Sequence, residues 1–105
     1  MFGLKDDSFK DYVLEQLRDL GNVECRRMFG SYGMYYRGIF FGILSKGQLY
    51  FKTSDETRPA YVQRGMTYFQ PNAKQHLKNY YEVPADVIED AESLAEWARK
   101  AIKAR

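Results

Sequence analysis

Apolar residues recur at helical spacing near the start of the chain, at Phe9, Val13, Leu17 and Leu20. Ser8 lies just before this stripe with Asp11 three residues further on, an arrangement typical of a helix N-cap. Gly21 follows the stripe and can end a helix in a left-handed conformation. The pattern predicts a helix over residues 8–20, preceded by a short flexible lead-in at residues 1–7.

A second helical stripe lies near the C-terminus. Its apolar face consists of Leu94, Trp97, Ala98, Ala101 and Ile102. Asp90 precedes it and is the expected N-cap of this last helix. A shorter helix is expected between residues 54 and 65, capped by Ser54 or Asp55, with Pro59 in its first turn and Gly65 at its end.

Between the helices the pattern changes to alternating or continuous apolar runs, which predict strands. The expected strands cover residues 23–29, 34–36, 39–44, 49–53, 66–70 and 78–83. Gly30 and Gly33 are expected to punctuate the first turn, as positive-φ residues or at a close backbone approach, and residues 45–47 form a hairpin signal. The order α-β-β-β-β-α-β-β-α predicts an α+β two-layer domain, in which helices pack on one side of an antiparallel sheet.

Length and composition fit one domain over residues 1–105. The chain is 45% hydrophobic, and its 16 basic and 14 acidic residues give a net charge of +2. This balance does not indicate nucleic-acid or membrane binding through bulk charge. No signal-peptide pattern or run of about 20 apolar residues is present, and a single cysteine excludes an internal disulfide. We therefore expect a cytoplasmic protein that does not enter a membrane.

No set of residues suggests a reaction. Cys25 alternates in phase with Val23 and Phe29, which favours a core position over a reactive thiol, although the arginines after it would lower its pKa. His76 has no partner at metal-ligand spacing and is expected in an exposed loop. No nucleophile elbow or phosphate-binding loop occurs. We expect no enzymatic activity, no metal and no cofactor.

Basic and aromatic residues gather on the predicted strands. The candidate binding residues are Arg26, Arg27, Tyr32, Tyr36, Arg37 and Lys52, accompanied by Tyr35 and Tyr50. This composition suits phosphate contact with base stacking, and it is also enriched at protein interfaces. A third interpretation is half-buried tyrosines with arginines covering their edges. Arg27 is the strongest single candidate, because it shares the phase of apolar neighbours.

Several segments together resemble a known family. They are Arg27-Met28-Phe29-Gly30-Ser31-Tyr32-Gly33, Leu49-Tyr50-Phe51-Lys52, Tyr80-Tyr81-Glu82-Val83-Pro84, and Trp97-Ala98 with Ala101. Over residues 9–102 the chain is similar to the N-terminal domain family of TfoX (Sxy), a bacterial regulator of natural competence. The resemblance implies an α+β domain, a bacterial source and a role in transcriptional control. Because the C-terminal helical domain of the full-length regulators is not present in the sequence, the chain resembles the stand-alone members.

Three functions remain open from the sequence. The first is a small regulatory or adaptor domain that acts through contacts with a protein partner, and a homodimer is one form of such contact. The second is direct nucleic-acid binding through the Arg/Tyr-rich sheet surface, which is less favoured because the net charge is small. The third is an enzyme or small-ligand domain, for which no acid, base, nucleophile or metal set can be named.

Overall fold

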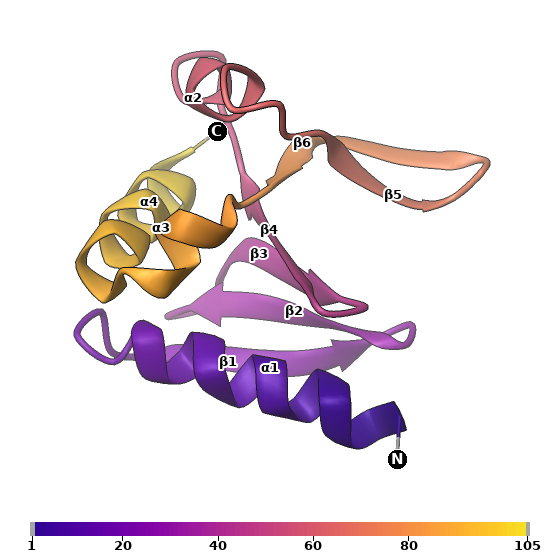
Figure 1. Ribbon diagram of the computed structural model, residues 1–105, viewed down its shortest axis with the longest axis vertical. Coiled ribbons are helices and arrows are strands. Elements are labelled where there is room, and N and C mark those ends of the chain that lie inside the picture. The colour runs from indigo at the N-terminus through magenta and orange to yellow at the C-terminus, as the bar shows by residue number, and fades with distance from the viewer. Residues whose placement is uncertain (1, 105) are drawn as a thin grey trace.

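The computed structural model describes residues 2–104, with side chains from residue 7 onward (Figure 1). The helices are α1 (Phe2–Gln16), α2 (Arg58–Val62), α3 (Ala85–Glu89) and α4 (Ala91–Lys103). The strands are β1 (Val23–Met28), β2 (Ser31–Tyr36), β3 (Ile39–Ser45), β4 (Gln48–Lys52), β5 (Tyr68–Asn72) and β6 (Gln75–Glu82). The predicted order of elements is confirmed, and α3 is an additional short helix between the last strand and the last long helix.

All six strands form one antiparallel sheet in the order β1-β2-β3-β4-β6-β5, so β1 and β5 are its edges. Residues of all four helical regions join one core cluster against the sheet, which confirms the predicted α+β fold with helices on one side. Figure 1 shows α1 alongside β1, α3 and α4 together beside the middle of the sheet, and the β5–β6 hairpin extending away from the helices.

Three successive hairpins are closed by two-residue turns in which both residues have positive φ. The turn pairs are Phe29-Gly30, Arg37-Gly38 and Lys46-Gly47, with φ between 49° and 84°. Positive φ at both central residues is the property of type I′ turns, whose twist matches that of the flanking strands. Each pair places glycine second, where it adopts this conformation without steric cost. The meander from β1 to β4 is therefore built by local turn chemistry.

Two details of the predicted first hairpin are wrong. Phe29 does not continue β1 in phase with Val23, because it occupies the turn and its side chain is 103% exposed. Gly33 does not lie in the turn; it pairs with Arg26 inside β2. The turn is therefore shorter than expected. It consists of Phe29 and Gly30 only, and Gly30 is its one glycine.

The helix boundaries differ from the prediction where side-chain caps were expected. α1 begins at Phe2, so Ser8 lies within the helix and residues 2–7, the expected lead-in, are helical. Met1 lies outside the described residues. After Gln16 the chain tightens into turns that include a Leu20 N–H to Leu17 carbonyl bond, and Gly21 has the expected left-handed conformation, with φ of 70°.

Of the caps predicted for α2 and α4, only that of α4 is correct. Thr57 is the N-cap residue of α2, so the predicted caps at Ser54 and Asp55 are wrong, whereas Pro59 does lie in the first turn. Ser54 instead exchanges hydrogen bonds with Thr57 in the preceding turn. The predicted cap of α4 is confirmed, because the Asp90 carboxylate accepts a hydrogen bond from the Glu92 amide.

The last two strands form a longer hairpin than predicted. Pro71 does not stop β5, since this strand lies at the sheet edge, where a missing N–H costs no ladder bond. β6 begins at Gln75, so His76 is in a strand rather than a loop, although it is exposed as expected.

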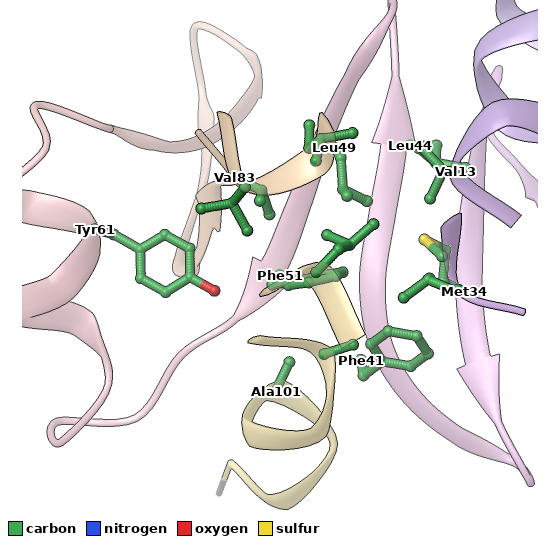
Figure 2. Close-up of a cluster of buried hydrophobic side chains, with 14 residues drawn as sticks. Val13, Met34, Phe41, Leu44, Leu49, Phe51, Tyr61, Val83 and Ala101 are labelled. Atoms are coloured by element: carbon green, nitrogen blue, oxygen red, sulfur yellow. The ribbon is translucent and has the colours of Figure 1, made fainter. Parts of the chain in front are cut away.

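The core lies between the sheet and the helices (Figure 2). Phe41 and Phe51 are fully buried, with ring centroids 5.6 Å apart, and Tyr61 of α2 packs edge-on against Trp97 of α4 at 4.8 Å. Figure 2 shows Phe51 at the centre of this cluster. Each fully buried large apolar side chain contributes roughly 1.5–3 kcal/mol, so this cluster is the main source of stability.

Candidate interaction surface on the uncovered sheet face

The sheet face opposite the helices carries a second apolar cluster, and we call it the uncovered face. Ile43, Tyr50 and Phe69 are buried there, and Met28, Phe40 and Tyr80 pack against them while partly exposed. Among the described residues, this cluster contains none from a helix. A sheet face with this many partly exposed apolar side chains is typical of a binding surface.

A row of aromatic rings crosses the uncovered face. Tyr35 and Phe40 have ring centroids 5.2 Å apart and an interplanar angle of 34°, and Phe40 and Tyr80 have corresponding values of 5.4 Å and 35°. The Arg26 guanidinium lies over the Tyr35 ring at 4.6 Å. We call Tyr35, Phe40 and Tyr80 the aromatic row. Its neighbouring rings contact one another at tilted angles, and the Arg26 guanidinium lies over the Tyr35 ring.

Gly33 makes room for this row. A Cβ atom at Gly33 would lie 3.1 Å from Phe40 Cε1 and 3.2 Å from Tyr35 Cε1. The two rings can therefore rest on the β2 backbone only because Gly33 has no side chain. The two glycines of the segment have different tasks: Gly30 supplies a positive φ, and Gly33 permits a close approach.

Charges of both signs border the aromatic row. Arg26 forms an exposed ion pair with Glu24 at 3.2 Å, and Lys52 lies directly opposite Tyr80 in the sheet. Glu82 lies opposite Tyr50 and accepts a hydrogen bond from Gln48 at 3.2 Å. The rim is therefore mixed rather than uniformly basic.

Two tyrosines of this face, Tyr50 and Tyr80, have a raised pKa and so remain protonated at neutral pH. Burial is the main reason that the pKa of Tyr80 is raised, and the nearby Tyr35 adds to it. Burial also raises the pKa of Tyr50, with a further contribution from the Glu82 carboxylate. The Tyr50 hydroxyl donates to Gln48 Oε1 at 2.8 Å, so it is fixed within the surface.

The six candidate residues predicted from the sequence do not form one site. Arg26 and Lys52 lie on the uncovered face, whereas Tyr32 and Tyr36 pack against the helix-side core. Arg37 lies in the β2–β3 turn, with its guanidinium 5.4 Å from the Tyr36 ring. Period-two alternation separates neighbours to opposite faces, so adjacent basic and aromatic residues were divided between two surfaces.

Arg27, the strongest candidate from sequence, lies on the helix side beside Tyr32. Its guanidinium is 5.4 Å from the Tyr32 ring, and Lys10 Nζ lies 5.0 Å from the same ring. The Tyr32 hydroxyl donates to Asp7 Oδ1 at 2.6 Å. Arg27 is exposed, so its charge stays in water while its guanidinium lies beside the Tyr32 ring.

Phe40 and Tyr80 are functional candidates that the sequence did not indicate. Phe40 lies in a continuous apolar run, which gives no sign of the face it takes. It pairs with Tyr35 across a register shift between Met34 and Tyr35, so its face does not follow from simple alternation along β3. Tyr80 reaches the row only because β6 lies beside β4. Strict alternation from Ile43 would have placed Phe40 on the helix-facing side, and only the register shift brings it to the uncovered face.

The other candidate groups have structural roles. Cys25 is half-buried against the core, and burial raises the pKa of its thiol to about 11, so it is not an activated nucleophile. The His76 ring Nδ1 shares a hydrogen bond with the Tyr68 hydroxyl at 3.0 Å. Within the described residues, no three potential metal ligands come together and no helix could cross a membrane.

An open cleft of about 980 Å³ lies between α2 and the end of α4. On its wall, the Arg58 guanidinium is held by Asp55 Oδ1 at 2.9 Å and by Asn79 Oδ1 at 3.3 Å, and its Nε donates to Thr53 Oγ1 at 3.1 Å. These bonds join the α2 segment to the sheet.

A comparison with protein families matches the chain to a known family. Residues 15–105 match the model described as the TfoX N-terminal domain, which is nearly the whole chain. The chain therefore belongs to the TfoX N-terminal domain family, as its sequence segments indicated. No curated protein matches the sequence.

Proposed function

We propose that this member of the TfoX N-terminal domain family is a small bacterial regulatory adaptor that binds a protein partner through the uncovered face of its sheet. In this proposal the domain catalyses no reaction, is cytoplasmic and acts in transcriptional control related to competence. The observation that carries the proposal is the partly exposed aromatic row, bordered by Arg26 and by charges of both signs.

The character of the row favours a protein partner. Aromatic residues and arginine are enriched at the centres of protein interfaces, where they act as anchors. Because the three rings already pack against one another, they need little further ordering when a partner binds. The acidic residues Glu24 and Glu82 suit a partner that offers both donors and acceptors.

Nucleic-acid binding is the second candidate, and the stack of Arg26 on Tyr35 beside Lys52 is the observation in its favour. Against it, base stacking needs open ring faces, whereas Arg26 lies over the Tyr35 ring and the three rings contact one another at tilted angles. The two carboxylates on the same face would also repel phosphates. The net charge of +2 gives little general attraction.

The test uses a substitution on the row and a matched substitution away from it. Tyr35→Glu places a charge in the row, and Tyr12→Glu places the same charge on α1, where Tyr12 is 42% exposed. Both variants and the native protein are used to capture proteins from a lysate of the source bacterium, after circular dichroism shows that each is folded. A partner retained by the native protein and Tyr12→Glu, but lost by Tyr35→Glu, is expected.

Retention of the same protein by Tyr35→Glu would contradict the proposed surface. The nucleic-acid alternative is tested separately, by fluorescence anisotropy with labelled single-stranded and duplex DNA at two salt concentrations. Salt-dependent binding that is lost in Arg26→Ala would put that alternative first. We expect no binding above background.

A further inference from the structure

The two edges of the sheet differ in how they are protected against pairing. β5 contains Pro71 and has register shifts on both sides of Phe69, two features that hinder the addition of another strand. β1 has neither: all six of its residues pair with β2 in one unbroken register, from Val23 opposite Tyr36 to Met28 opposite Ser31. β1 is therefore the more regular of the two edges.

The hairpin geometry shows which backbone groups of β1 point outward. A two-residue turn is closed by a hydrogen-bonded pair, here Met28 with Ser31. Hydrogen-bonded pairs then alternate along the strand, so the N–H and C=O groups of Arg27, Cys25 and Val23 are directed away from β2. In the described part of the chain, no hydrogen bond from outside the sheet reaches these backbone groups. They form a template for another strand.

A second copy of this chain fits that template in one register. In a symmetric antiparallel pair, opposed residues share a face of the sheet, so the two-fold axis must pass through a residue opposite its own copy. An axis at Arg26 opposes two arginines, and an axis at Glu24 opposes two glutamates. An axis at Cys25 instead opposes each Glu24 to Arg26 of the other copy, giving two opposite-charge pairs.

The register centred on Cys25 also satisfies the outward backbone groups. Cys25 faces its own copy and Val23 faces Arg27, and all three have their N–H and C=O groups directed outward. Glu24 and Arg26 then occupy the closely spaced, non-hydrogen-bonded pairs, where side chains lie nearest. Both side chains are well exposed, at 65% and 60%, and so can reach a partner.

We propose that the domain forms a symmetric homodimer in which the β1 strands of two copies pair antiparallel, with Cys25 opposite Cys25 and Glu24 opposite Arg26 of the other copy. The pairing joins two six-stranded sheets into one continuous sheet. It also places two uncovered faces side by side, since a two-fold axis perpendicular to the sheet keeps each face on the same side. The dimer rests on the backbone groups of the β1 edge, whereas the partner proposed above binds the aromatic row. The two proposals share Arg26, which stacks on Tyr35, and its ion-pair partner Glu24, so substitutions at these two residues are expected to affect both.

Charge reversal tests the proposed register. Glu24→Arg and Arg26→Glu each turn both cross-copy pairs into like-charge pairs, and we expect each to raise the dimer dissociation constant about tenfold or more in sedimentation experiments. The double variant, Glu24→Arg with Arg26→Glu, restores opposite charges and should dimerise like the native protein. Control variants Glu96→Arg and Lys100→Glu make the same changes of net charge on exposed positions of α4 and should have no effect.

Amide hydrogen exchange locates the interface independently of the variants. As protein concentration rises from micromolar to millimolar, the amides of Val23, Cys25 and Arg27 should become protected, while those of β5 should not. A native protein that stays monomeric over this range would overturn the proposal. So would a dimer that leaves these three amides unprotected, or one whose double variant is as weak as the single variants.

Discussion

Phe29 is the position where one substitution should make the domain more stable. It has φ of 49° at the first central position of the β1–β2 turn, and its side chain is 103% exposed. A left-handed conformation costs a residue with a Cβ atom about 1–2 kcal/mol, and asparagine bears it best among such residues. Because the phenyl ring is fully exposed, replacing it removes no burial.

We therefore expect Phe29→Asn to raise the free energy of unfolding by about 0.5–1 kcal/mol. For a domain of this size, that corresponds to a rise in Tm of about 2–5 °C. Urea unfolding and calorimetry measure the two quantities. The slope of the urea transition should not change, since the native fold and the surface exposed on unfolding stay the same.

Phe29→Ala separates the backbone effect from the loss of the ring. It removes the phenyl group but keeps a Cβ atom, so its stability should stay within about 0.5 kcal/mol of the native value. A Phe29→Asn protein that is no more stable than Phe29→Ala would refute the reasoning. A more stable Phe29→Asn protein would instead show that the native phenylalanine lowers local stability, as residues kept for contact with a partner often do.

Three further predictions concern the core, a cap and the cysteine. Gly42→Ala should destabilise the fold by about 1–3 kcal/mol in urea unfolding, because the new Cβ would lie 3.0 Å from the Tyr50 carbonyl oxygen and 3.2 Å from Phe51 Cδ1; a neutral result would contradict this. Asp90→Ala should cost about 1 kcal/mol and Asp90→Asn much less, since only alanine removes the cap acceptor. Burial raises the pKa of the Cys25 thiol from about 9 to about 11, so the unfolded state releases this proton first and stability should fall as pH rises above about 9. Cys25→Ala should lessen that fall, and an unchanged pH profile would argue against a buried thiol.

The elements of the fold were largely readable from the sequence because their signals are local. Two-residue turns with glycine in second place mark the hairpins. The apolar positions from Leu94 to Ile102, which follow the cap residue Asp90, identify α4. The errors fall where a tertiary contact or an edge position decides. α1 continues through Ser8, and β5 accepts Pro71 because no strand lies beyond it.

The candidate surface was less predictable, because it depends on strand order and on which face each residue takes. Arg26 and Arg27 are neighbours in sequence, yet one stacks on Tyr35 and the other on Tyr32, on opposite faces. The aromatic row needs β6 beside β4, which is a long-range pairing without a local signal. Sequence composition thus indicated the residue types of the surface but not its members.

Site-specific photo-crosslinking tests the central claim, that the uncovered face binds a protein. A photoreactive phenylalanine is placed at Tyr35 or Tyr80 in the aromatic row, and at Tyr12 or the 54% exposed Val62 as controls on the helices. Irradiation in the source cells should give a protein adduct from the two positions in the row and none from the controls. An adduct from Tyr12 or Val62 alone, or nucleic acid as the only species crosslinked at Tyr35 and Tyr80, would contradict the account.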